Sequence, residues 1–180
     1  MPVLPLDVFW KKLAESQLLS ANQIADVRAA YQELKIESGS QENQTAIAAQ
    51  WLVRQRVLTL WQAKQLLKGN ASNFFLGDYR LLDKRGMSPG GVVYQGRHEP
   101  TKQVVSLVPI DDSVSQRVDV WTEVVRQVER AAETTSPILS RTWALESAGG
   151  NRFIVCEDLV SQVSVAEGSQ TLKWSVVEAV

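Results

Sequence analysis

The first 70 residues of the chain repeat apolar side chains at the spacing of an α-helix. Ile24, Val27, Tyr31 and Leu34 recur every three or four positions, and charged side chains occupy the other faces. Similar patterns occur before and after this segment and are separated by polar breaks. The predicted helices lie over residues 7–16, from residue 20, around residues 47–52 and from residue 59.

Two short motifs mark the starts of helices in this region. Ser20-Ala21-Asn22-Gln23 and Thr59-Leu60-Trp61-Gln62 both have the form of a capping box, in which the first side chain accepts from a backbone N–H and the glutamine reaches back. An apolar pair precedes each motif, Leu18-Leu19 and Val57-Leu58. The repeat predicts two helical hairpins that pack together. Two short helical segments that look alike by chance would give the same pattern.

After residue 75 the pattern changes to short runs of β-branched and aromatic residues, which is typical of strands. A helix with one apolar face is predicted over 121–132, and Pro137 prevents its continuation. Gly86–Gly91, with three glycines and a proline, is expected to break regular structure. The pattern predicts an α+β fold whose five-stranded antiparallel sheet is built from residues 78–84, 92–94, 103–108, 138–145 and 152–156.

Composition narrows the class of protein. The chain has 44% hydrophobic and 22% charged residues, which is typical of a folded domain. A net charge of −1 gives no electrostatic footprint for nucleic acid, and no apolar run reaches the roughly 18 residues of a membrane span. A single cysteine and an N-terminus unlike a signal peptide predict a cytoplasmic protein without internal disulfides. The sequence contains no Cys/His cluster, and it therefore predicts no metal site.

The stretch Leu76–His98 resembles the opening of a bacterial, eukaryotic-like (Hanks-type) Ser/Thr protein kinase domain. In that family the first two strands flank a loop written G-x-G-x-x-G-x-V. The resemblance covers roughly residues 75–180, and the order of three strands, one helix and two strands is that of a kinase N-lobe. The second glycine is replaced and the other motif positions are kept, with Gly86, Ser88, Gly91 and Val93 in the four positions.

The junction before this stretch supports the same resemblance. Helical extensions with a Leu-Thr-x-x-Gln-Ala element before a Leu-Gly-x-Tyr start occur ahead of some bacterial Ser/Thr kinase domains, and Leu58–Ala63 and Leu76–Tyr79 are similar to them. The resemblance implies a helical module over residues 1–70, an N-lobe-like domain over 75–168, and the start of a C-lobe helix over 169–180. Because this last helix has no C-cap, we expect that the chain is cut within it.

The resemblance also implies a nucleotide site whose charged residues are replaced. The strand lysine that holds the phosphates falls at Val108, and the helix glutamate that pairs with it falls at Gln127. Neither side chain can form that ion pair. A shifted alignment would place Glu123 in the acidic position, but a solvated helix residue is the preferred interpretation.

The remaining site positions are also altered. Ser88 replaces a glycine whose missing side chain would let the loop approach the phosphates closely. Pro89 removes one backbone N–H donor from the same loop. Cys156 aligns with the residue at the back of the nucleotide pocket. A lone cysteine on an apolar strand is usually a core residue, and this is the preferred interpretation. Glu157-Asp158-Leu159 would form the hinge to the C-lobe. The catalytic His-Arg-Asp and metal-binding Asp-Phe-Gly motifs are absent, and His98 is the single histidine.

These replacements lead to the hypothesis of a pseudokinase region that acts through protein–protein interaction in signalling, with no catalytic or metal-binding residues and no cofactor. The expected partner is another protein or the chain's own C-lobe, with self-association as a further option. The alternative is the N-terminal part of a Ser/Thr kinase that binds ATP and Mg²⁺ atypically and phosphorylates proteins through a C-lobe outside this chain. In a third interpretation, the helical module carries the function and the N-lobe is a remnant.

Overall fold

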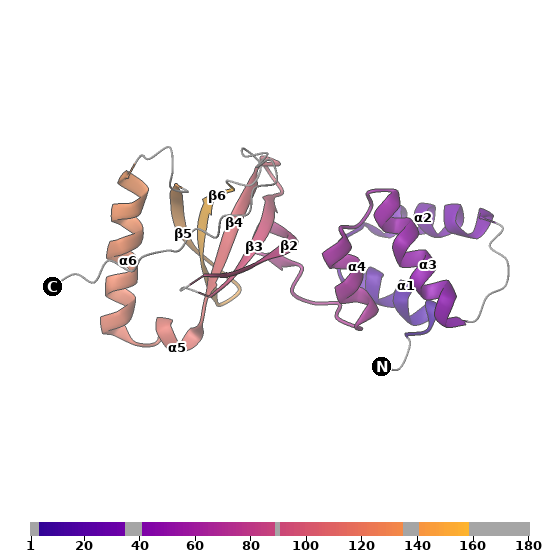
Figure 1. The fold of residues 1–180 in the computed structure, drawn as a ribbon, viewed down its shortest axis with the longest axis horizontal. Helices are drawn as coiled ribbons and strands as arrows, with labels where there is room; N and C mark the ends of the chain where they lie inside the picture. The colour runs from indigo at the N-terminus through magenta and orange to yellow at the C-terminus, as the bar shows by residue number, and fades with distance from the viewer. Residues whose placement is uncertain (1–3, 35–40, 89–90, 135–140, 159–180) are drawn as a thin grey trace, which may run out of the picture.

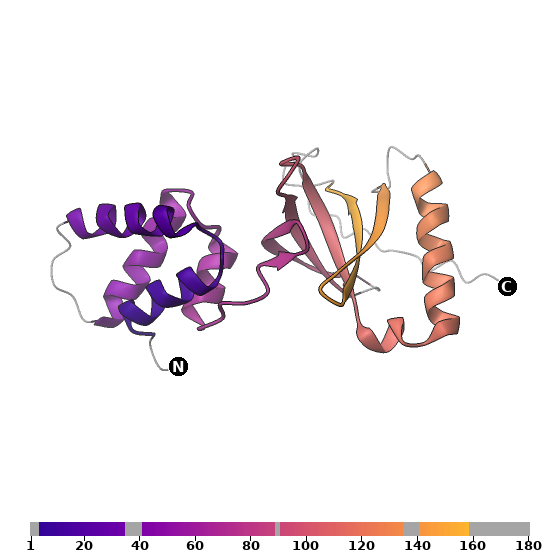
Figure 2. The same ribbon diagram turned by 180° about the vertical axis from the view of Figure 1, so that it is seen from behind.

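The computed structural model describes residues 4–34, 41–88, 91–134 and 141–158. Four helices come first in the chain and a sheet with two further helices follows (Figure 1). The sheet lies between the first four helices and helix α6, and the view from behind shows the same order (Figure 2). The four N-terminal helices are α1 (Leu6–Glu15), α2 (Ala21–Glu33), α3 (Gln41–Arg54) and α4 (Leu60–Leu67).

Both predicted capping boxes are confirmed. The Ser20 side chain accepts from the backbone N–H of Gln23 at 3.3 Å, and the Gln23 side chain accepts from the backbone N–H of Ser20 at 2.9 Å. The second box has the same geometry, with distances of 3.2 and 3.0 Å between Thr59 and Gln62. Three residues before each cap the backbone is left-handed, with φ of 59° at Gln17 and 58° at Arg56. The repeat in sequence therefore coincides with a repeat of local backbone structure.

The helices share one apolar core. Side chains from α1, α3 and α4 meet there, and three of them, Phe9, Leu52 and Leu66, are fully buried. A row of aromatic rings crosses this core, because Trp10 contacts Phe9 and Tyr31 with centroids 5.8 Å apart in each pair. Their burial supplies most of the stabilisation of this bundle, since apolar area removed from water is the main favourable term in folding.

Among the described residues the sheet has six antiparallel strands, one more than the pattern predicted. The additional strand is β1 (Phe75–Leu76), which pairs with β2 (Tyr79–Ser88) across a turn at Gly77. Two residues are too short to show the alternation from which a strand is predicted. The strand order is β1-β2-β3-β4-β6-β5, with β3 (Gly91–His98), β4 (Val104–Ile110), β5 (Thr142–Ala148) and β6 (Asn151–Glu157).

The turn at Gly77 requires glycine. Its φ is +54°, and a Cβ built there would lie 2.8 Å from the Cβ of Ala148. A side chain at this position would therefore meet both backbone strain and a collision. This close approach brings β1 against the turn that joins β5 to β6.

Two helices follow β4, where the sequence predicted one. Helix α6 (Val118–Glu133) confirms the predicted amphipathic helix and lies beside β5 (Figure 1). The short α5 (Asp112–Ser115) was not predicted, and the Asp111 side chain caps it by accepting from the Ser113 backbone N–H at 2.9 Å. The predicted helix over residues 169–180 and the strand residues 138–140 lie outside the described part of the chain.

Candidate functional site

Strand pairing places the predicted nucleotide-site positions on one face of the sheet. Gln95 on β3 lies opposite Ser106 on β4, and Ser106 lies opposite Cys156 on β6. Side chains two residues apart on a strand share a face, so Val93 and Val108 lie on the same side. We call these five residues, Val93, Gln95, Ser106, Val108 and Cys156, the inner face.

A carboxylate lies across the inner face. Asp158 follows β6 and is only 2% exposed. Gln95 donates through its side-chain amide to one carboxylate oxygen, and the Ser106 hydroxyl lies 3.3 Å from the other. These bonds offset the cost of burying the carboxylate. Ser106 pairs with Cys156, which the resemblance aligns with the back of a nucleotide pocket.

Val108 is half-buried opposite Ile154 on β6 and offers neither a charge nor a donor. The nearest earlier lysine does not replace it. Lys102 lies in the turn between β3 and β4, where its ammonium is 2.7 Å from the Glu99 carboxylate. The cation that would hold a nucleotide's phosphates is therefore absent from the position that the resemblance implies.

The two candidate acidic positions of α6 interact with each other on the helix surface. The Gln127 amide donates to the Glu123 carboxylate at 2.9 Å, and Arg126 binds the same carboxylate at 2.6 Å. These hydrogen bonds hold the pKa of Glu123 below its ordinary value. Gln127 is exposed and the Glu123 side chain is 46% exposed, so both remain accessible to solvent.

The glycine loop is more regular than the sequence predicted. Gly86 pairs with Val93 and Ser88 pairs with Gly91, so both strands continue into the stretch that was expected to break. Gly86 and Gly91 have positive φ, 155° and 126°, and glycine allows the strands to run on through these conformations. Residues 89–90, including Pro89, lie outside the described part of the chain.

The expected hinge also begins later than predicted. Glu157 still belongs to β6, where it pairs with Val105 and its backbone N–H donates to the Arg141 carbonyl at 2.8 Å. Cys156 precedes it, half-buried, and burial raises the pKa of its thiol. The sulfur of Cys156 lies 3.9 Å from the Thr142 hydroxyl of β5.

A second cluster, which sequence reasoning missed, joins the helices to the sheet. Gln62 on α4 is fully buried, and its amide donates to the Leu81 carbonyl of β2 at 2.7 Å. The Thr59 hydroxyl donates to the Leu82 carbonyl at 2.6 Å. Both residues of the second capping box therefore also hold the neighbouring strand. Ser20 and Gln23 of the first box are exposed, so the two boxes differ in burial and in their hydrogen bonds to the sheet.

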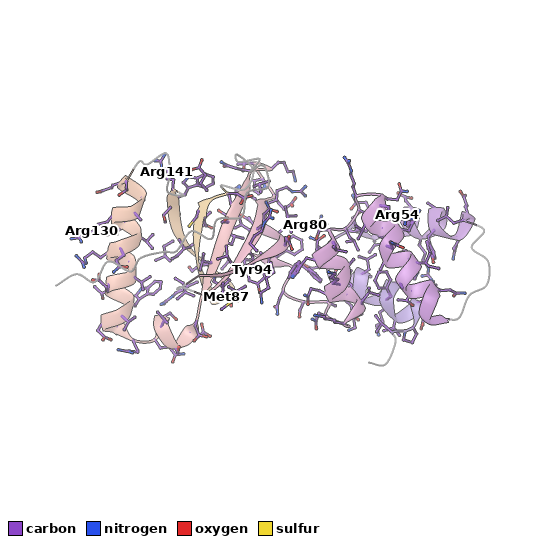
Figure 3. The ribbon with its side chains drawn as sticks, in the orientation of Figure 1. Arg54, Arg80, Met87, Tyr94, Arg130 and Arg141 are labelled. Carbon is purple, nitrogen blue, oxygen red and sulfur yellow. The ribbon has the colours of Figure 1, made fainter. Side chains whose placement is uncertain are left out.

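Arg80 of β2 completes this junction and lies between the sheet and the helices (Figure 3). Its guanidinium donates to the Leu18 carbonyl at 3.1 Å and to the Val57 carbonyl and Gln62 side chain, both at 3.5 Å. Leu18 and Val57 each follow the left-handed residue of one repeat, so a single guanidinium contacts both turns. No sequence signal marked Arg80, because its partners are backbone carbonyls far away in the chain.

Within the four described ranges, no three or more His, Cys, Asp or Glu side chains gather as a metal site would require. Each helix in those ranges is too short or too polar to cross a bilayer.

The strand order β1-β2-β3-β4-β6-β5, with helices α5 and α6 between β4 and β5, defines a fold of mixed helix and antiparallel sheet. Comparison with known proteins gave no matching family model and no matching curated protein. Among solved structures, the chain is similar to the crystal structure of the Mycobacterium tuberculosis PknI kinase domain, with a TM-score of 0.40 and 18% identity. The match covers 47% of this chain and 34% of that chain, so this chain spans about a third of that structure's length.

Proposed function

We propose that this region is a catalytically degenerate protein kinase N-lobe (residues 75–168) joined to a helical module (residues 1–70), and that it acts in cytoplasmic signalling by binding proteins. The observation that carries the proposal is the state of the inner face. It has Val108 where a kinase has its lysine, and the buried Asp158 carboxylate bound by Gln95 and Ser106 where the base would lie.

The chemistry of phosphoryl transfer explains why this arrangement is unfavourable for catalysis. Protein kinases act by positioning the phosphates and neutralising their charge with a lysine and metal ions. A carboxylate on the same face repels the polyanionic triphosphate, and the low dielectric around a buried group strengthens that repulsion. Admitting a base would also break the hydrogen bonds of Asp158.

Exposed apolar side chains support a role in protein binding. A groove of about 500 Å³ lies between α3 and α4, and its lining includes Ile47, Val53 and Leu60. Leu60 is 59% exposed, and Val118 at the start of α6 is 79% exposed. Apolar surface of this kind commonly marks sites of protein interaction.

The alternative is the N-terminal part of an active Ser/Thr kinase that binds ATP atypically and uses a C-lobe outside this chain. The retention of Gly86, Gly91 and Val93 favours it. Because glycine has no side chain, a loop with glycines at positions 86 and 91 permits closer approach to a ligand than one with larger residues.

A phosphotransfer assay separates the two functions. The native protein in its full length is incubated with γ-³²P-ATP, Mg²⁺ and a general acceptor protein, and label in the acceptor and in the protein itself is counted. We expect no label above a control without the protein, because neither a lysine nor an αC-type glutamate is available. Label that disappears when Gly91 is replaced by valine would establish the alternative.

A further inference from the structure

A small cavity beside the junction is lined by three arginines from three elements. It has a volume of about 300 Å³ and lies between the turn after α3, the start of α4, and strands β2 and β3. Arg56 comes from the turn, Arg80 from β2 and Arg97 from β3. No acidic residue is among those that line it, which are Val53, Arg56, Val57, Leu58, Thr59, Gln62, Arg80, Leu82 and Arg97.

The charge of Arg80 has no acidic counterpart in its own hydrogen bonds. Its acceptors are two carbonyls and the Gln62 amide, all neutral, and its buried Nε has no acceptor among the described residues. Burial, together with the repulsion of the neighbouring Arg97, holds the pKa of Arg80 below its ordinary value. The charge of Glu99 opposes this shift in part. A partly buried cation whose hydrogen-bond acceptors are all neutral is unfavourable, so an anion nearby would stabilise it.

The other two arginines leave the surplus of positive charge in place. Arg97 binds the Glu99 carboxylate at 2.8 Å, but Lys102 binds the same carboxylate at 2.7 Å. One negative charge is therefore shared between two cations. Arg56 is exposed and forms no ion pair within the described ranges.

We propose that this cavity binds a phosphate group, either free or carried by a phosphorylated side chain. Guanidinium groups present planar pairs of donors that match phosphate oxygens, and clusters of arginines are a common means of recognising phosphorylated groups. A phosphate here is held by donors from the helical turn and from two strands. It therefore links the helical module to the sheet, and its binding stabilises their junction.

Titration of the full chain with inorganic phosphate tests the site. Thermal unfolding is followed at constant pH and ionic strength while phosphate replaces chloride. We expect a saturable rise in Tm. Arg56→Asn places a residue that tolerates left-handed backbone at this position. It should weaken the affinity for phosphate at least about tenfold, because the loss of one charge-assisted hydrogen bond has roughly that effect. No saturable rise, or a rise unchanged in Arg56→Asn, overturns the proposal.

A matched variant controls for general electrostatics. Arg54 lies two residues earlier on α3, is exposed and does not line the cavity (Figure 3). Arg54→Gln removes the same charge and should leave phosphate affinity within about twofold, because exposed charges at a distance are screened by salt. Equal weakening by Arg54→Gln and Arg56→Asn would show diffuse attraction only and would overturn the proposal.

A second titration identifies the source of the phosphate group. N-acetyl-phosphoserine methylamide is compared with inorganic phosphate and with the unphosphorylated serine compound. Tighter binding of the phosphoserine compound supports a phosphorylated side chain as ligand, and equal or weaker binding supports free phosphate. Binding of the unphosphorylated compound as strongly as either would overturn recognition of phosphate.

Discussion

Replacing Gln62 with leucine should lower the free energy of unfolding by about 3 kcal/mol. The change keeps most of the side-chain volume but leaves the Leu81 carbonyl and the Thr59 backbone N–H without their partners, and a buried unpaired group costs about 1–3 kcal/mol. It also removes one acceptor of the Arg80 guanidinium. Chemical denaturation followed by tryptophan fluorescence measures the effect.

The repeat supplies a control for this substitution. Gln23 makes the same reciprocal capping bonds at the start of α2, but it is exposed, whereas Gln62 is fully buried. Gln23→Leu should lower stability by only about 0.5–1 kcal/mol, as loss of an exposed cap does. Losses of equal size in the two variants would show that Gln62 acts only as a helix cap.

Replacing Arg80 with methionine should loosen the junction between the helices and the sheet. The three hydrogen bonds to Leu18, Val57 and Gln62 are lost together, and hydrogen bonds to a charged group are each worth about 1.5–3 kcal/mol when well formed. Because two of these bonds are long, we expect a total loss of about 2 kcal/mol. Trypsin cleavage after Lys68, in the exposed end of α4, should accelerate at least about tenfold.

Arg85 provides the comparison for Arg80. It lies five positions further along the same strand and is exposed. Arg85→Met removes the same charge from β2 without a contact to the helices, and we expect the cleavage rate after Lys68 to stay within about twofold of the native rate. Unchanged cleavage in Arg80→Met would mean that the apolar contacts of Trp61 with Phe74 and Tyr94 hold the junction alone.

Local features of this fold were predictable from the sequence. Each capping box depends on side chains three residues apart, so Ser20 and Thr59 identified helix starts without knowledge of the tertiary structure. The amphipathic α6 was predicted for a similar reason, because its apolar residues recur at helical spacing. Strand β1 and helix α5 were missed because two and four residues carry too little periodicity.

The tertiary features could not be predicted in this way. Asp158 was expected in a hinge, yet it is buried because Gln95 and Ser106, which are 63 and 52 residues away in sequence, provide donors on the same face. No sequence pattern identified Arg80, because two of its acceptors are backbone carbonyls of residues far away in the chain. A polar side chain that is satisfied by distant backbone leaves no local pattern.

The two faces of the sheet use alternate positions of the same strands. The apolar core of the sheet, which includes Leu107, Phe153 and Val155, uses the strand positions that alternate with those of the inner face. Under the proposed function, a change of lysine to valine at position 108 would therefore leave this core intact.

Calorimetry with Mg·ATP on this chain tests the central claim most directly. The titration uses Arg56→Asn, so that the arginine-lined cavity does not contribute, and inorganic triphosphate serves as the comparison without a base. We predict no saturable heat from Mg·ATP beyond that of triphosphate, because Asp158 occupies the inner face and Val108 supplies no cation. Saturable Mg·ATP binding that exceeds triphosphate binding and is lost on changing Gly91 to valine would contradict the account.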